Sequence, residues 1–160
     1  MSISVGDRMP EGSFAVMTSD GPDSLSSADL FSGKKVVLFS VPGAFTPTCS
    51  AKHLPGFVEH AAAIKAKGVD TIACIAVNDV FVMEAWGSSQ SVGDDVQMLA
   101  DGNGDYTNAL GLGLDASGFG MGQRGQRFAL IVDDGVATGV FVEAPGEFKV
   151  SAADAVLANL

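Results

Sequence analysis

The chain has 160 residues, of which 47% are hydrophobic and 18% charged, and its nine basic and nineteen acidic residues give a net charge of −10. This length and composition predict a single domain over residues 1–160 that buries a real core. The negative charge repels nucleic acid and anionic membrane surfaces, so we expect neither as a partner. The first residues show no basic segment followed by an apolar one, and no apolar stretch approaches membrane-spanning length, which favours a cytoplasmic protein.

Three short apolar runs predict buried strands, over residues 34–41, 69–77 and 96–100. A helical pattern of apolar residues occupies residues 48–66, between the first two runs. A shorter helix is expected over residues 80–86, directly after an Asn-Asp pair that makes a good helix cap. Strands and helices that alternate in this order predict right-handed crossovers and a parallel sheet.

The pattern changes in the last third of the chain. Two apolar runs, residues 127–132 and 136–142, flank an Asp-Asp-Gly turn and predict an antiparallel hairpin. Residues Ser151 to Asp154 have the pattern of a capping box and predict the start of a final helix. A parallel unit joined to an antiparallel hairpin and closed by a helix is the thioredoxin arrangement. We therefore predict an α/β protein with the thioredoxin fold, a mixed central sheet flanked by helices.

Residues 102–125 contain eight glycines and predict either a mobile wall of an active site or a long insertion. Their G-x-G-x-x-G match at residues 120–125 has no strand before it, so it does not predict a nucleotide site. Residues 101–105 resemble the start of a calcium loop but lack its later glycine and glutamate. His53 and His60 have no third ligand nearby for zinc. None of these patterns therefore predicts a metal or cofactor.

The most informative segment is PGAFTPTC, residues 42–49, which directly follows the first predicted strand. Open α/β sheets bind their ligands at the carboxyl ends of the strands. Thr46 is a good N-cap and Pro47 suits the first helical position, which makes Cys49 the third helical residue. There, unpaired backbone N–H groups and the positive end of the helix dipole favour a thiolate. We therefore predict that Cys49 is reactive.

A thiolate that attacks a hydroperoxide needs hydrogen-bond donors for the oxygen that leaves. Thr46 supplies a hydroxyl, the helix start supplies backbone N–H groups, and an arginine would add a fixed fork of donors. The chain has three arginines, at positions 8, 124 and 127. Arg127 begins a predicted strand and is the preferred candidate, while Arg124 in the glycine-rich segment is the weaker one. A solvated charge at the end of a strand is the alternative interpretation of Arg127.

Residues 42–57, PGAFTPTCSAKHLPGF, closely resemble the active-site region of type II peroxiredoxins, the peroxiredoxin-five subfamily, whose signature is P-x-x-x-T-x-x-C. The resemblance extends to residues 77–87 and to the late Arg127-Phe segment. It implies a thioredoxin fold with an N-terminal extension, and reduction of hydrogen peroxide and alkyl hydroperoxides without a metal or organic cofactor.

The resemblance also implies roles for single residues. Cys49 would be the peroxidatic cysteine, Pro42 would shield the site, and Thr46 and Arg127 would orient thiolate and peroxide. The expected substrate pocket includes Gly43, Phe45 and Thr48. Thr48 stands where some relatives have glycine, which bears on pocket shape more than on catalysis.

Attack on a peroxide leaves Cys49 as a sulfenic acid, which another thiol must reduce. Cys74 is the only internal candidate, but it lies in mid-strand, about four residues or roughly 13 Å from the sheet edge. A disulfide needs Cα atoms within about 7 Å, so we favour a packing role for Cys74 and leave a resolving role open. Because Cys49 is expected to open toward the loop side, the reductant would be glutathione, glutaredoxin or thioredoxin, among which the sequence does not choose.

Two other functions use the same segment. A peroxide sensor or holdase would be oxidised once at Cys49 instead of turning over. A disulfide reductase is disfavoured, because Thr46 occupies the place of the first cysteine of C-x-x-C. The resemblance further implies a non-covalent homodimer formed by loops near the active site, with which Phe45 and Phe81 as exposed apolar groups would be consistent.

Overall fold

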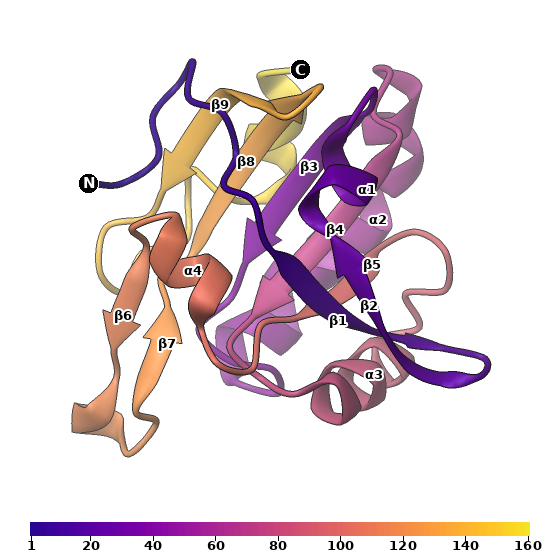
Figure 1. Ribbon diagram of the computed structural model, residues 1–160. Coiled ribbons are helices and arrows are strands. Elements are labelled where there is room, and N and C mark those ends of the chain that lie inside the picture. Colours follow the sequence, from indigo (N-terminus) through magenta and orange to yellow (C-terminus); the bar gives the residue numbers. More distant parts are fainter.

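The computed structural model describes residues 1–160, which form a seven-stranded mixed sheet with helices on both faces (Figure 1). The strands of this sheet are β1 (Ser13–Thr18), β2 (Gly21–Ser26), β3 (Lys35–Ser40), β4 (Thr71–Ala76), β5 (Gln97–Ala100), β8 (Phe128–Asp133) and β9 (Val136–Val142). The helices are α1 (Ser27–Phe31), α2 (Leu54–Ala66), α3 (Val80–Ser89), α4 (Asp105–Ala109) and α5 (Ala153–Ala158). A separate hairpin of β6 (Gly113–Asp115) and β7 (Gln123–Gly125) projects from the body of the molecule (Figure 1).

The strand order is β2-β1-β5-β4-β3-β8-β9. Strands β3, β4 and β5 are parallel, as the alternation of strands and helices predicts. Strand β8 runs antiparallel to β3 and forms the expected hairpin with β9. Its two-residue turn has Asp134 at φ 47° and Gly135 at φ 79°, the left-handed pair that a tight hairpin requires. The predicted thioredoxin-like fold with a mixed, helix-flanked sheet is confirmed.

The central strands have apolar residues on both faces because each face is covered by its own core. Val37 and Phe39 of β3 pack into a core under α2, α3 and α5. Val36 and Leu38 pack into a second core under α1, α4 and the N-terminal segment. Alternating residues of one strand thus pack into two different cores, which explains why the sequence shows a continuous apolar run there.

The helical segment after β3 departs from the expected regular helix. It begins at Pro47, but residues Cys49–His53 form a π-helical turn, in which Leu54 N–H donates to the Cys49 carbonyl five residues back. Pro55 has no N–H to give, so the α-helical ladder is already interrupted at this point. The wider turn thus lies directly at the predicted reactive cysteine.

The predicted capping box of the last helix is wrong. Helix α5 begins at Ala153 with Ala152 at its cap position, and no side chain caps it. The helix begins two residues after Ser151, so Ser151 is not at the cap position, and its hydroxyl donates to Glu143 Oε2 at 2.6 Å.

Two regions contain structure that the sequence patterns do not predict. The β1–β2 hairpin and α1 precede the first predicted strand, and the glycine-rich residues 102–125 fold into α4 and the β6–β7 hairpin.

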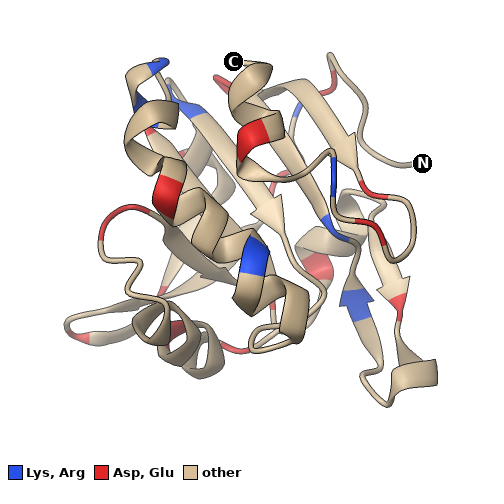
Figure 2. Cartoon of the chain, turned by 180° about the vertical axis from the view of Figure 1, so that it is seen from behind, with Lys and Arg blue, Asp and Glu red and all other residues tan.

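Acidic residues are spread over helices and loops and form no single run (Figure 2). None of the helices combines the length and the apolar character needed to cross a membrane.

Candidate active site

Cys49 lies just beyond the carboxyl end of β3, where the sequence places it. The helix starts at Pro47, which makes Cys49 its third residue, and the backbone N–H groups of Thr48 and Cys49 donate to no backbone carbonyl. The Cys49 side chain is fully buried in the core under α2. The expected opening of Cys49 toward the loop side is not seen in this structure, because the side chain has no exposed surface.

The Thr46 hydroxyl contacts the sulfur directly. Its Oγ1 lies 2.8 Å from Cys49 Sγ and 2.7 Å from the Gly43 carbonyl oxygen, and it caps no backbone N–H of the helix. A hydroxyl has one proton, so Thr46 donates either to the carbonyl or to the sulfur. When Cys49 is a thiolate, the sulfur can only accept a hydrogen bond. The Thr46 hydroxyl then donates to the sulfur.

The Arg127 guanidinium approaches Cys49 from the start of β8. Its Nη2 donates to Cys49 Sγ at 3.1 Å, and its Nη1 donates to His53 Nδ1 at 2.8 Å. The same guanidinium lies 5.8 Å from the ring centroid of Phe148. Three side chains therefore fix the direction in which the arginine presents its charge to the sulfur.

His53 is held as a neutral acceptor for that arginine. Its Nε2 lies 3.0 Å from the Ser151 carbonyl oxygen, which can only accept, so Nε2 carries the proton and Nδ1 is free to accept from Arg127. Burial, followed by the positive charge of Arg127, lowers the pKa of His53 to about 3. The imidazole therefore adds no second positive charge beside the sulfur.

Arg124, the weaker candidate, does not contact the sulfur. Its Nε donates to the Met121 carbonyl at 2.9 Å and its Nη1 to the Val77 carbonyl at 3.1 Å. It thereby fastens the β6–β7 hairpin to the end of β4. A Cβ added at Gly43 would lie 3.2 Å from Met121 Cε and 3.5 Å from Arg124 Nη1, so the hairpin packs directly against the Pro42–Thr46 loop.

The remaining predicted site residues surround this centre without contacting the sulfur by hydrogen bonds. Pro42 is half-buried and Gly43 is buried in the loop that follows β3. Phe45 is 55% exposed and has φ 65°, a conformation that bulky side chains rarely adopt. Thr48 is exposed at the helix start, so its side chain faces solvent while its N–H remains at the site.

Cys74 is buried in the same core as Cys49, and both thiols are free. Strand β4 ends two residues after Cys74, about 7 Å along the strand, so the predicted separation of roughly 13 Å from the sheet edge is too long. Burial raises the pKa of the Cys74 thiol well above its ordinary value, and a negative charge on Cys49 raises it further. Cys74 is therefore held as a thiol.

The site thus combines a buried cysteine sulfur, a hydroxyl and a guanidinium that contact it, and a helix start on a thioredoxin-like sheet. Comparisons with known proteins agree with this arrangement. The Redoxin family model matches residues 4–157. Peroxiredoxin-2B from Arabidopsis thaliana is 52% identical over 161 residues, which cover 99% of this chain and 98% of that protein. The chain belongs to the Redoxin family and is a peroxiredoxin. Peroxiredoxins are thiol peroxidases, so it is an oxidoreductase of that class, and the resemblance to type II peroxiredoxins is confirmed.

Solved peroxiredoxin structures share the fold over its full length. Reduced Prx3 from Vibrio vulnificus in complex with hydrogen peroxide is 51% identical, has a TM-score of 0.95, and matches over 98% of each chain. The antioxidant protein of Plasmodium falciparum, named a 1-Cys peroxiredoxin, is 31% identical with a TM-score of 0.90, over 99% of this chain and 100% of that one.

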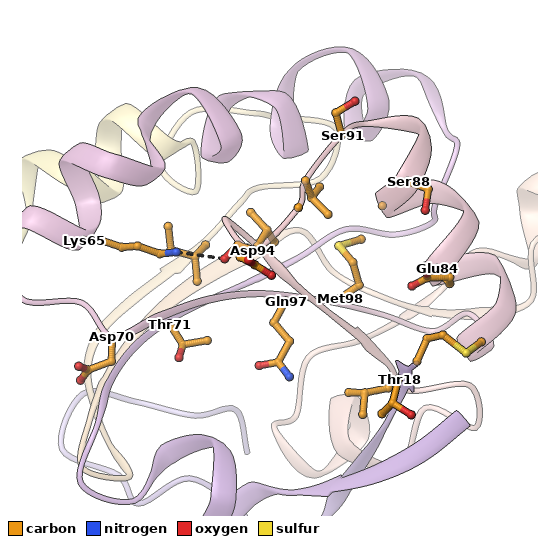
Figure 3. A pocket seen from close by; sticks show the side chains of 17 residues that line it. Thr18, Lys65, Asp70, Thr71, Glu84, Ser88, Ser91, Asp94, Gln97 and Met98 are labelled. Carbon is orange, nitrogen blue, oxygen red and sulfur yellow. Dashed lines mark hydrogen bonds between the residues drawn. The ribbon is translucent and has the colours of Figure 1, made fainter. Parts of the chain in front are cut away.

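One large groove of this peroxiredoxin lies away from Cys49. It measures about 760 Å³ and opens at the amino ends of β4 and β5, the opposite end of the strands from the cysteine (Figure 3). Its polar side chains include Lys65, whose Nζ donates to the Asp94 carbonyl at 3.1 Å. It contains no cysteine or histidine, so it offers no thiol chemistry.

The contact of His53 with the Arg127 guanidinium is not among the contacts that the sequence predicts, because His53 suggests only a zinc ligand there. A signal was available, because residues four apart on a helix share a face, and His53 follows Cys49 by four. Phe148 and Ser151, which contact His53 from the other side, come from a segment nearly one hundred residues later, and no local pattern connects them.

Proposed function

We propose that Cys49 is the nucleophile of this thiol peroxidase and that Thr46 and Arg127 are the residues that assist it. The observation that carries the proposal is the convergence of two donors on one sulfur, Thr46 Oγ1 at 2.8 Å and Arg127 Nη2 at 3.1 Å. Donors of this kind stabilise a thiolate in the resting state, and they meet the oxygen that becomes negative during the reaction.

The oxidation step follows from this geometry. The Cys49 thiolate attacks one oxygen of a hydroperoxide, the O–O bond breaks, and the other oxygen leaves as an alkoxide or hydroxide that takes up a proton. Cys49 is left as a sulfenic acid. The N–H groups of Thr48 and Cys49 in the first helical turn donate to no backbone carbonyl, and Arg127 Nη2 donates to the sulfur. These donors would stabilise the attacked and departing oxygens.

The sulfenic acid is then reduced by an external thiol. A first thiol forms a mixed disulfide with Cys49 and releases water, and a second thiol releases Cys49 and the external disulfide. Burial and the raised pKa of Cys74 support this route, because the thiolate is the attacking species and Cys74 is poorly ionised. Glutathione, glutaredoxin and thioredoxin remain the candidate donors, and each needs a local opening of the structure around the buried Cys49.

The enzyme acts as a non-covalent homodimer. Phe45 and Phe81 are 55% and 64% exposed, and they follow the carboxyl ends of the adjacent strands β3 and β4. The Ala44 N–H donates to Asn78 Oδ1 at 3.0 Å, which ties the two loops together. Exposed aromatic groups on one edge of the sheet support a contact between two copies. The cytoplasmic location stays a prediction.

Peroxide consumption with alternative donors tests the cycle. Wild type and Cys74→Ser are supplied with hydrogen peroxide and either glutathione with glutaredoxin or thioredoxin with its reductase. Both proteins should turn over many equivalents with at least one donor. A wild type that consumes a single equivalent with every donor would contradict a turnover cycle and favour a sensor.

A further inference from the structure

The loop between β9 and α5, residues 144–150, is closed by one buried carboxylate. Glu143 is 7% exposed, and its Oε2 accepts from Lys149 N–H at 2.7 Å, from Ser151 N–H at 2.9 Å and from the Ser151 hydroxyl at 2.6 Å. Although burial alone would raise it, these hydrogen bonds lower the pKa of Glu143. The carboxylate thus stays charged and fixes where the loop returns to the protein.

The closed loop supplies two contacts to the residues around Cys49. The Ser151 carbonyl accepts from His53 Nε2 at 3.0 Å. The Phe148 ring packs edge-on against the His53 ring, with centroids 5.0 Å apart, and lies beside the Arg127 guanidinium. The imidazole is therefore held between Phe39 of β3 and a loop whose position depends on Glu143.

Glu143 contacts neither Arg127 nor the sulfur and acts on them only through Ser151 and His53. The positive charge of Arg127 is therefore not offset by an adjacent carboxylate. Its guanidinium has no carboxylate within ion-pair distance, since the one ion pair of the structure joins Lys149 and Glu147. A carboxylate placed directly on Arg127 would offset the charge that the sulfur and the departing oxygen use. A neutral imidazole orients the guanidinium and leaves its charge free.

Burying the Glu143 carboxylate also costs free energy that an apolar contact closing the same loop would not cost. Glu143 Oε1 is buried and has no hydrogen-bond partner. A buried acceptor without a partner costs free energy, and an apolar residue could close a loop without that cost.

We propose that Glu143 is a positioning residue of the peroxidase reaction. It sets the Ser151 carbonyl so that His53 keeps its proton on Nε2, which leaves Nδ1 to accept from Arg127 and directs Arg127 Nη2 at Cys49. If Ser151 moved, His53 could carry its proton on Nδ1, and two N–H groups would then face each other between His53 and Arg127. The proposal rests on the roles of Cys49 and Arg127 given above.

The test combines a rate with a spectroscopic readout of the tautomer. The variants are Glu143→Ala, the conservative Glu143→Gln, and Glu147→Ala as a matched control, an exposed glutamate of the same loop. The rate of Cys49 oxidation by hydrogen peroxide is measured by stopped-flow fluorescence of Trp86, the single tryptophan, whose Nε1 donates to Ser50 beside the cysteine. The ring nitrogens of His53 are observed by ¹⁵N NMR, which is simple because the chain has two histidines.

Glu143→Ala should lower the second-order oxidation rate constant about tenfold, the scale of one lost hydrogen bond to a charged group. The His53 spectrum should change from one fixed tautomer to an average of two. Glu143→Gln keeps one carbonyl acceptor and should recover part of both, and Glu147→Ala should match wild type.

A folded Glu143→Ala protein with the wild-type rate and the wild-type His53 tautomer would overturn the proposal. If that variant does not unfold cooperatively, Ser151→Ala decides the question, because it removes only the hydroxyl donor and keeps the backbone groups. A smaller loss of rate with a detectable tautomer change is expected there, and no change in either would overturn the proposal. Failure of the proposed function is recognised separately, because wild type itself would then show no oxidation of Cys49.

Discussion

The buried, neutral His53 predicts a specific dependence of stability on pH. Its pKa is about 3 in the folded protein, against about 6.5 for an unperturbed histidine in the unfolded chain. Below pH 6.5 the unfolded chain binds a proton that the folded protein does not, so the free energy of unfolding falls as pH falls. The slope approaches 1.4 kcal/mol per pH unit, and the loss attributable to His53 between pH 7 and pH 4.5 amounts to about 2.5 kcal/mol.

Urea unfolding of wild type and His53→Gln at pH 7 and pH 4.5, followed by Trp86 fluorescence, measures this loss. The variant should lose about 2.5 kcal/mol less than wild type over this interval, because carboxylates titrate in both proteins and their contributions cancel. His60→Gln, which changes the other histidine of the same helical segment, should keep the wild-type dependence. Equal pH dependence of wild type and His53→Gln would refute a buried neutral imidazole.

Three further predictions concern the reaction and the assembly. Arg127→Ala and Thr46→Val should each slow peroxide oxidation of Cys49 by about two to three decades in stopped-flow experiments, and Arg124→Ala should do far less, since it contacts backbone carbonyls only. If Arg124→Ala slowed oxidation more than Arg127→Ala, the assignment of Arg127 as the assisting arginine would be wrong. Cys74→Ser should keep most activity with glutathione and glutaredoxin, while a stoichiometric Cys49–Cys74 disulfide together with an inactive variant would contradict external resolution. Light scattering at micromolar concentration should give the mass of a dimer, and a monomeric mass would argue against the proposed contact.

Much of the fold follows from local patterns in the sequence. The apolar runs that became β3, β4 and β8 are short, continuous and bounded by turn residues, which is typical of strands covered on both faces, and β9 follows β8 across a turn signal. The cap before α3 is also local, and Asp79 Oδ1 accepts from Val82 N–H as predicted. The β1–β2 hairpin was missed because β2 is mostly exposed and its sequence, GPDSLS, has little strand character.

The candidate site likewise contains some contacts that local sequence predicts and others that it does not. Thr46 and Cys49 are three residues apart, so their contact follows from the helix start. Arg127 could be ranked above Arg124 only because one begins a strand and the other lies in a glycine-rich segment. The contacts of His53 with Ser151 and of Arg127 with Phe148 join distant segments, and only the packing of the sheet brings these together.

Cys74 shows where reasoning from strand length fails. Its position in mid-strand was read correctly, but β4 ends at Ala76, two residues after Cys74 and not the expected four, so Cys74 lies nearer the edge of the sheet than predicted. Burial and ionisation, rather than distance along the strand, now support its packing role.

The identity of the nucleophile is tested most directly by treating the reduced protein with one equivalent of hydrogen peroxide in the absence of other thiols. Mass spectrometry of the digested protein should show the gain of one oxygen atom on the peptide that contains Cys49, in a form that a sulfenic acid reagent traps. Cys49→Ser should fold with wild-type spectroscopic properties and reduce no peroxide, because a serine hydroxyl does not ionise usefully beside these donors. Oxidation at another residue, or turnover retained in Cys49→Ser, would contradict the account.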